Sequence, residues 1–88
     1  MPKAYLKINN QRGLHALAAA KFVKIASNYD TEVTVSKDGQ TVSGISIMGL
    51  LMLAAMPGDK IVLETTGAQV IEGLKALSNL IKKKFKEL

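Results

Sequence analysis

The order of apolar and polar residues along the chain predicts seven secondary-structure elements. Apolar and polar side chains alternate in three short segments, which is typical of strands with one buried face. The apolar centre Ile61-Val62-Leu63 indicates a fourth strand, and three other segments repeat apolar residues at the spacing of a helix. The expected elements are, in chain order, strand 4–8, helix 16–27, strands 32–36 and 40–43, helix 46–52, strand 60–65 and helix 68–84.

These elements indicate an α+β fold of order βαββαβα. Asp38-Gly39 favours a tight hairpin turn, so the strands on either side of it are expected to pair antiparallel. The two long helices each have one apolar stripe, formed by Ala19, Phe22, Val23 and Ala26 in the first and by Val70, Leu74, Leu77 and Ile81 in the last. One sheet with helices on one face buries such stripes most simply. The 88 residues suffice for a single domain, residues 1–88, and not for two.

Composition excludes several classes of function. The chain has no Cys, which rules out disulfides, thiolate metal sites and thiol nucleophiles, and suits a reducing cytoplasm. No run of about 20 apolar residues exists, so we expect no insertion into a membrane. The first residues read as a strand, which argues against a secretory signal. A cytoplasmic protein is therefore expected.

The net charge of +5 is concentrated near the C-terminus, at Lys82, Lys83, Lys84 and Lys86. Lysines that close a helix interact favourably with the negative end of its dipole, which accounts for this cluster without a nucleic-acid partner. The four aromatic residues are not expected to interleave with basic residues on one strand, as a base-stacking surface would require. A basic nucleic-acid binder is therefore the disfavoured alternative, and we expect no nucleic-acid partner.

The single histidine, His15, precedes the first helix in the position of an N-cap. The first N–H groups of a helix lack intrahelical partners and can bind an anion, here with the amides of Ala16 and Leu17. A neutral imidazole can attack phosphorus and form a phosphoramidate. A simple cap or surface residue is the competing interpretation of a lone histidine. A metal site is not expected, because one histidine without neighbouring ligands cannot hold zinc.

The residues around His15 favour the phosphoryl interpretation. Gly13-Leu14-His15-Ala16, followed by Ala19 and Lys21-Phe22-Val23, resembles the active-site segment of the HPr family, the histidine phosphocarriers of the bacterial sugar phosphotransferase system. Ser46-Ile47-Met48-Gly49 resembles the second motif of that family, and the resemblance covers the whole chain.

The resemblance implies an open-faced β-sandwich with four antiparallel strands covered by three helices. It also implies phosphorylation of His15 on Nδ1 by enzyme I and delivery to an enzyme IIA-type acceptor, with no cofactor. The chain would then be a phosphoryl-transfer intermediate rather than a stand-alone enzyme. A monomer is expected.

Three positions depart from the family pattern. Leu17 stands where the family typically has arginine, Ala18 replaces proline, and Ile45 replaces a basic residue often found before Ser46. A guanidinium at position 17 would make charge-assisted bonds to phosphate, so Leu17 implies slower or less complete phosphorylation. The alternative is a regulatory binding module of the same fold whose phosphotransfer is impaired by Leu17.

The second helix is apolar on almost every side. A two-turn helix can bury only one face, so several of Ile47, Met48, Leu51 and Met52 should be exposed as an adaptable docking surface. Lys21 and Lys24 are expected to flank this surface and to attract acidic partners. Ser46 is well placed as the N-cap of this helix. The family resemblance adds that Ser46 is phosphorylated by a dedicated kinase, with a serine kinase/phosphorylase as the implied partner.

Overall fold

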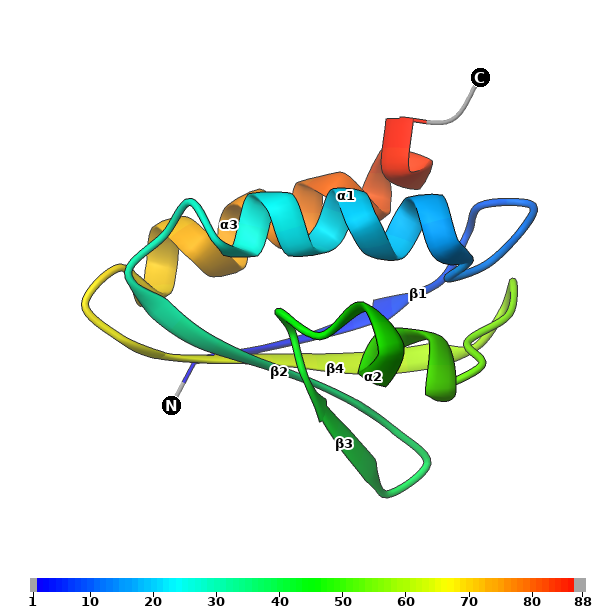
Figure 1. The fold of residues 1–88 in the computed structure, drawn as a ribbon, viewed down its shortest axis with the longest axis horizontal. Coiled ribbons are helices and arrows are strands. Elements are labelled where there is room, and N and C mark those ends of the chain that lie inside the picture. Colours follow the sequence, from blue (N-terminus) through cyan, green and yellow to red (C-terminus); the bar gives the residue numbers. More distant parts are fainter. Residues whose placement is uncertain (1, 87–88) are drawn as a thin grey trace.

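The computed structural model describes residues 2–86 and has the expected order of strands and helices (Figure 1). The elements are β1 (Lys3–Lys7), α1 (Ala16–Ala26), β2 (Thr31–Lys37), β3 (Gln40–Ser43), α2 (Ile47–Met52), β4 (Lys60–Gly67), α3 (Val70–Lys82) and the 3₁₀ turn η1 (Lys84–Lys86). Met1, Glu87 and Leu88 lie outside the described residues.

The four strands form one antiparallel sheet in the order β1-β4-β2-β3. β4 pairs on one side with β1 and on the other with β2, where Leu63 lies opposite Val35. The hairpin predicted at Asp38-Gly39 is confirmed: both residues have positive φ, 50° and 82°, as the favoured two-residue turn requires.

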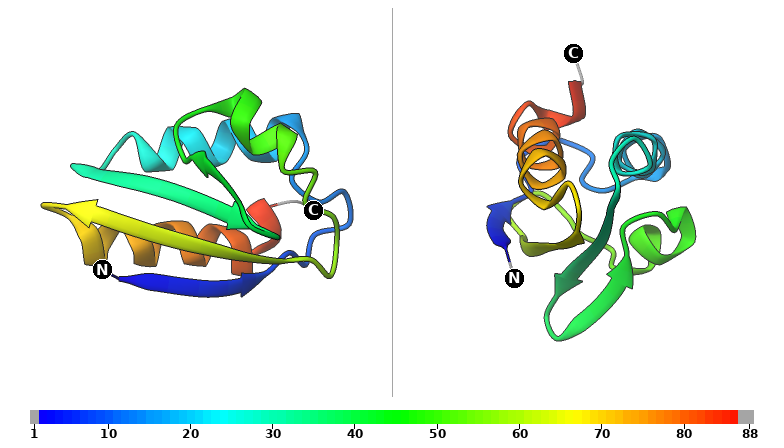
Figure 2. Two further views of the ribbon diagram at one scale, coloured as in Figure 1. Left: turned by 90° about the horizontal axis from the view of Figure 1, so that it is seen from below. Right: turned by 90° about the vertical axis from the view of Figure 1, so that its left-hand side faces the viewer.

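The helices cover one face of this sheet, which confirms the predicted open-faced α+β fold. α1 and α3 lie side by side over the sheet, and α2 packs against α1 near the β3 edge (Figure 2). The apolar stripe of α1 is buried at Ala19, Phe22 and Ala26, with Val23 packed at its margin. The strands contribute Val33, Val35, Ile61 and Leu63 to the same core.

The C-terminal helix differs from its prediction in two ways. α3 begins at Val70 rather than at residue 68 and ends at Lys82 rather than at 84. Its buried side also lies differently, because Val70 and Leu74 are only partly buried whereas Leu80 is 3% exposed. Gly73 is one reason, since a Cβ there would come within 2.9 Å of the Thr31 side chain, so the helix approaches β2 on its glycine side.

The chain turns back on itself directly after α3. Lys84, Phe85 and Lys86 all have left-handed backbones with φ between 55° and 59°. This conformation costs a residue with a side chain about 1–2 kcal/mol, and the reversal buries the Phe85 ring completely. The side chain of Lys21 donates to the Phe85 carbonyl oxygen at 2.9 Å. Burial of one aromatic side chain thus fixes a turn that helical periodicity alone does not show.

On the uncovered face of the sheet, the expectation that no aromatic residue lies between basic residues on one strand is wrong for β1. β1 alternates Lys3, Tyr5 and Lys7 on this face, with Tyr5 76% exposed, so an aromatic residue does lie between basic residues on one strand. RNA-binding sheets stack two or three bases on several aromatic rings. In the described strands Tyr5 is the one aromatic residue, so the pattern is not that of a stacking surface.

Candidate functional site

His15 lies at the end of a short, tightly bonded loop between β1 and α1. The side-chain amide of Asn10 donates to the Gly13 carbonyl oxygen at 2.6 Å, and the His15 backbone N–H donates to the same oxygen at 3.0 Å. The loop is anchored from outside by the Leu14 N–H, which donates to the Ala55 carbonyl oxygen at 2.9 Å. These bonds hold the backbone that carries His15 in one conformation.

Gly13 is required at this point of the loop for two independent reasons. Its φ is +67°, a left-handed conformation that strains other residues. A Cβ at this position would also collide with the carbonyl oxygen of Ala55. The loop therefore rests directly on the backbone that follows α2.

His15 is the N-cap of α1, as predicted. Its backbone is extended (φ −84°, ψ 179°), and its carbonyl oxygen accepts a bond from the Ala19 N–H at 2.8 Å. The ring is partly buried, and its side chain makes no capping bond to the helix. The first turn of α1 contains no acidic residue, so no carboxylate there competes with an anion for the amides of Ala16 and Leu17.

Leu17 projects from the first turn of α1 beside His15. Its side chain is 57% exposed, so it lies on the outward side of the helix. A leucine side chain has no hydrogen-bond donor, so the first two residues of α1, Ala16 and Leu17, offer an anion only their backbone N–H groups.

Ser46 caps α2 as expected. Its hydroxyl oxygen accepts a bond from the Gly49 N–H at 3.0 Å, and its carbonyl oxygen accepts one from the Leu50 N–H at 3.0 Å. A Cβ on Gly49 would lie 3.1 Å from the Ser46 hydroxyl and 3.2 Å from Val42, which explains a glycine inside so short a helix.

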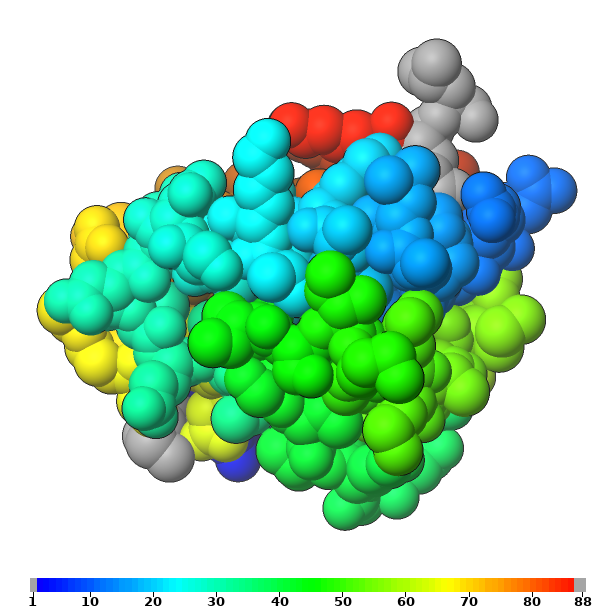
Figure 3. All heavy atoms as spheres, in the orientation of Figure 1, coloured from blue at the N-terminus to red at the C-terminus, as the bar shows by residue number. Residues whose placement is uncertain are grey.

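The outward face of α2 forms an apolar surface next to α1. Ile47, Met48 and Met52 are 40%, 68% and 66% exposed, whereas Leu51 is partly buried against the core. Two residues outside the predicted set are also exposed, Ile45 (60%) just before the N-cap of α2 and Met56 (56%) in the segment after this helix. Figure 3 shows α2 directly beneath the first half of α1 on this side of the molecule. These exposed residues are named the docking face after the role that is proposed for them: Leu17, Ile45, Ile47, Met48, Met52 and Met56.

Lys21 and Lys24 lie beside α3 and η1. The Lys21 ammonium group is bound to the Phe85 carbonyl oxygen. Both lysines line a shallow groove of about 260 Å³, together with Ile25, Asn28, Leu80 and Lys86. Helical periodicity places such residues on the polar side of α1 but does not show which neighbouring element they meet.

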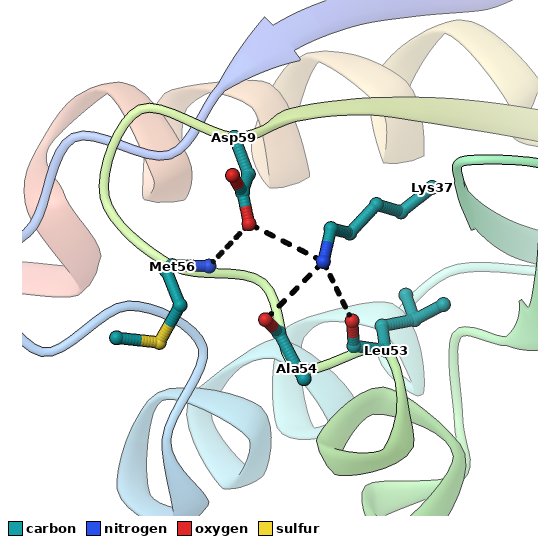
Figure 4. Close-up of polar contacts among 5 residues, drawn as sticks. All are labelled: Lys37, Leu53, Ala54, Met56 and Asp59. Atoms are coloured by element: carbon teal, nitrogen blue, oxygen red, sulfur yellow. Dashed lines mark hydrogen bonds and ion pairs between the residues drawn. The ribbon is translucent and has the colours of Figure 1, made fainter.

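Behind the docking face, an ion pair fastens the segment between α2 and β4 (Figure 4). The Lys37 ammonium group donates to the carbonyl oxygens of Leu53 and Ala54 at 3.1 and 3.3 Å, and it lies 3.3 Å from the Asp59 carboxylate. The same carboxylate accepts the Met56 N–H at 2.8 Å. That backbone bond, followed by the Lys37 bond, lowers the pKa of Asp59 below its usual value. Sequence reasoning missed this pair, because its members stand 22 positions apart.

Within residues 2–86, the structure contains no cluster of metal ligands and no helix that could span a membrane. No group of three or more His, Cys, Asp and Glu side chains there could hold a metal ion. None of the described helices is long and apolar enough to cross a membrane.

Comparison with known proteins agrees with the fold and shows the family of the chain. Residues 3–83 match the family model of the PTS HPr component phosphorylation site. The chain is 48% identical to phosphocarrier protein HPr of Neisseria meningitidis over 87 residues, which cover 99% of this chain and 98% of that protein. A crystal structure of HPr from Thermoanaerobacter tengcongensis superimposes with a TM-score of 0.95 at 39% identity, covering 100% of this chain and 99% of the other.

One chain of a crystal structure of an HPr dimer from the same organism superimposes with a TM-score of 0.79, also at 39% identity, covering 99% of this chain and 100% of the other. The βαββαβα fold of the chain is thus shared with the solved HPr structures. The chain belongs to the HPr family of phosphocarrier proteins of the phosphotransferase system.

Proposed function

We propose that the chain accepts a phosphoryl group on Nδ1 of His15 from phosphorylated enzyme I and passes it to an enzyme IIA-type acceptor. The observation that carries this proposal is the position of His15, partly exposed at the N-cap of α1 on a loop with a fixed backbone. In the accepting step the imidazole nitrogen attacks phosphorus, a P–N bond forms, and the bond from phosphorus to the donor breaks. In delivery a nucleophile of the acceptor attacks phosphorus, a bond from phosphorus to the acceptor forms, and the P–N bond breaks with the imidazole of His15 as the leaving group.

Backbone groups stabilise the phosphate in this proposal. The amides of Ala16 and Leu17 and the positive end of α1 face the site, and the first turn has no acidic residue to oppose them. Leu17 supplies none of the charge-assisted bonds that an arginine would make, which are worth about 1.5–3 kcal/mol. That difference corresponds to roughly a ten- to a hundredfold change in the rate or extent of phosphorylation.

The docking face is the proposed contact for both partners. It lies next to His15 along α1 and α2, and its exposed side chains include three methionines, which adapt to differently shaped surfaces. A monomer in the cytoplasm suits a carrier that binds enzyme I and its acceptor in turn. A dimer that changed or covered the docking face would interfere with both partner contacts. The oligomeric state should therefore be measured together with transfer.

Ser46 is the proposed site of regulation by a serine kinase/phosphorylase. Its hydroxyl caps α2 at the edge of the docking face, between exposed Ile45 and Ile47. A phosphate at a helix N-terminus is tolerated by the helix. It would instead add negative charge beside the partner contact and weaken the binding of acidic partners.

A regulatory module without phosphotransfer is the second candidate, and the exposed apolar Leu17 is the observation that favours it. A relay assay separates the two functions. Labelled phosphoenolpyruvate, enzyme I and an enzyme IIA-type acceptor are mixed with and without the chain, and label on the acceptor is followed over time. The carrier requires transfer that depends on the chain and stops in His15→Ala. Binding to the acceptor without any transfer would support the regulatory module.

A further inference from the structure

The His15 loop depends on the backbone between α2 and β4, residues 53–59. The Leu14 N–H bonds to the Ala55 carbonyl oxygen at 2.9 Å, and Gly13 lies so close to that oxygen that no side chain fits between them. A shift of Ala55 would therefore be passed to the two residues that precede His15.

The same segment also holds the end of β1, from which the loop departs. The Ile8 N–H donates to the Asp59 carbonyl oxygen at 2.9 Å, and the Gly58 N–H donates to the Ile8 carbonyl oxygen at 2.8 Å. Both ends of the His15 loop thus rest on backbone groups of one short segment.

Lys37 and Asp59 fix the shape of this segment from the side of the sheet. Lys37 comes from the end of β2, and its ammonium group reaches the last carbonyl oxygens of the α2 region at Leu53 and Ala54 (Figure 4). Ala54 has a left-handed backbone with φ +52°, a strained conformation that needs support from its surroundings. Asp59 closes the arrangement by binding both Lys37 and the Met56 N–H.

We propose that Lys37 and Asp59 are positioning residues for phosphoryl transfer at His15, an inference that rests on the proposed function. Neither side chain has to touch the phosphate. Their four polar contacts keep Ala55 in place, Ala55 keeps Gly13-Leu14 in place, and His15 follows. Transfer requires close alignment of the attacking nitrogen with phosphorus, so even a small displacement of the loop slows it.

The test uses Lys37→Met in the full chain, which keeps the apolar stem and removes the ammonium group. Phosphorylation by enzyme I and phosphoenolpyruvate is measured at increasing enzyme I concentration, at a temperature where the variant is fully folded by circular dichroism. We expect the limiting rate to fall about tenfold, with a smaller change in the half-saturating concentration. Lys37→Arg should restore the rate, because its guanidinium can reach carbonyl oxygens and carboxylate together.

Gln69→Ala is the matched control. It removes the bond of 2.6 Å that the Asp30 N–H makes to the Gln69 side chain, in the loop before α3 at the opposite end of the molecule (Figure 1). This variant should be phosphorylated at the wild-type rate.

The outcomes separate failure of the proposed phosphocarrier function from failure of the positioning role of Lys37 and Asp59. A wild-type chain that is never phosphorylated defeats the proposed function itself. Normal phosphorylation of wild type together with a change of less than about twofold in Lys37→Met overturns the positioning role alone. An equal loss in Gln69→Ala also overturns that role, since it would reflect general stability.

Discussion

Substitution of Gly13 by alanine tests how closely the His15 loop rests on the segment after α2. The left-handed φ of +67° costs an alanine about 1–2 kcal/mol. The collision of its Cβ with the Ala55 carbonyl oxygen adds an overpacking cost of about 1–3 kcal/mol, because backbone cannot move aside as a flexible side chain could. The expected loss in the free energy of unfolding is therefore about 2–5 kcal/mol.

Gly39→Ala is the control for the collision. Gly39 has φ +82°, but no atom lies within 4 Å of a Cβ built there, so this variant carries the backbone strain alone. Urea unfolding followed by circular dichroism gives both free energies, and their difference isolates the contact with Ala55. Equal destabilisation of the two variants would refute the close packing of the loop. A loss for Gly13→Ala that exceeds the control by about 1 kcal/mol or more would support it.

Four further predictions follow from single contacts. Leu17→Arg should speed phosphorylation by enzyme I roughly ten- to a hundredfold, measured as the initial rate of label uptake, and an unchanged rate would show that the backbone suffices. Phe85→Ala should lower the free energy of unfolding by about 3–5 kcal/mol in urea titrations, whereas a loss below about 1 kcal/mol would contradict full burial of its ring. Ser46→Ala should lower the free energy of unfolding by about 0.5–2 kcal/mol, because the α2 cap is lost. Urea titration measures this change, and an unchanged free energy would contradict a stabilising cap. The Met56 N–H, followed by Lys37, lowers the pKa of Asp59 in the folded chain. The stabilisation from Asp59 is therefore present above the unfolded pKa of about 3.9 and is lost as the pH falls through the folded value. Urea midpoints should fall more steeply from neutral to acid pH for wild type than for Asp59→Asn, and parallel curves would contradict a lowered pKa of Asp59.

Much of the fold could be predicted because local patterns determine it. The buried stripe of α1 follows from helical spacing at Phe22 and its neighbours, and the β2–β3 turn follows from the conformational freedom of Asp38-Gly39. The cap positions of His15 and Ser46 also follow from the residues that precede each apolar run. These features depend on contacts within a few residues.

The C-terminal turn could not be predicted in the same way. Lys84 and Phe85 have backbone conformations that their residue types disfavour, and only the burial of the Phe85 ring against the rest of the core makes the turn stable. Lys21 likewise looks like an ordinary surface lysine of α1 until the turn brings the Phe85 carbonyl oxygen to it. Long-range packing decides both features.

In the candidate site, too, local features could be predicted from the sequence and long-range contacts could not. Motif spacing predicts His15 as the phosphorylation site, and the residues of α2 predict its apolar character, but the docking face also takes in Met56, which lies in a turn without periodicity. The Lys37–Asp59 pair joins the end of one strand to the start of another, and it is visible only when the chain is folded.

Phosphorylation of His15 can be measured directly on the intact protein. Wild type and His15→Ala are incubated with enzyme I and phosphoenolpyruvate, and the products are examined by intact mass spectrometry before and after mild acid. Wild type should gain one acid-labile phosphoryl group, and fragmentation should locate it on His15, while His15→Ala gains none. Failure of wild type to gain label at long times, or equal labelling of His15→Ala, would contradict the phosphocarrier account.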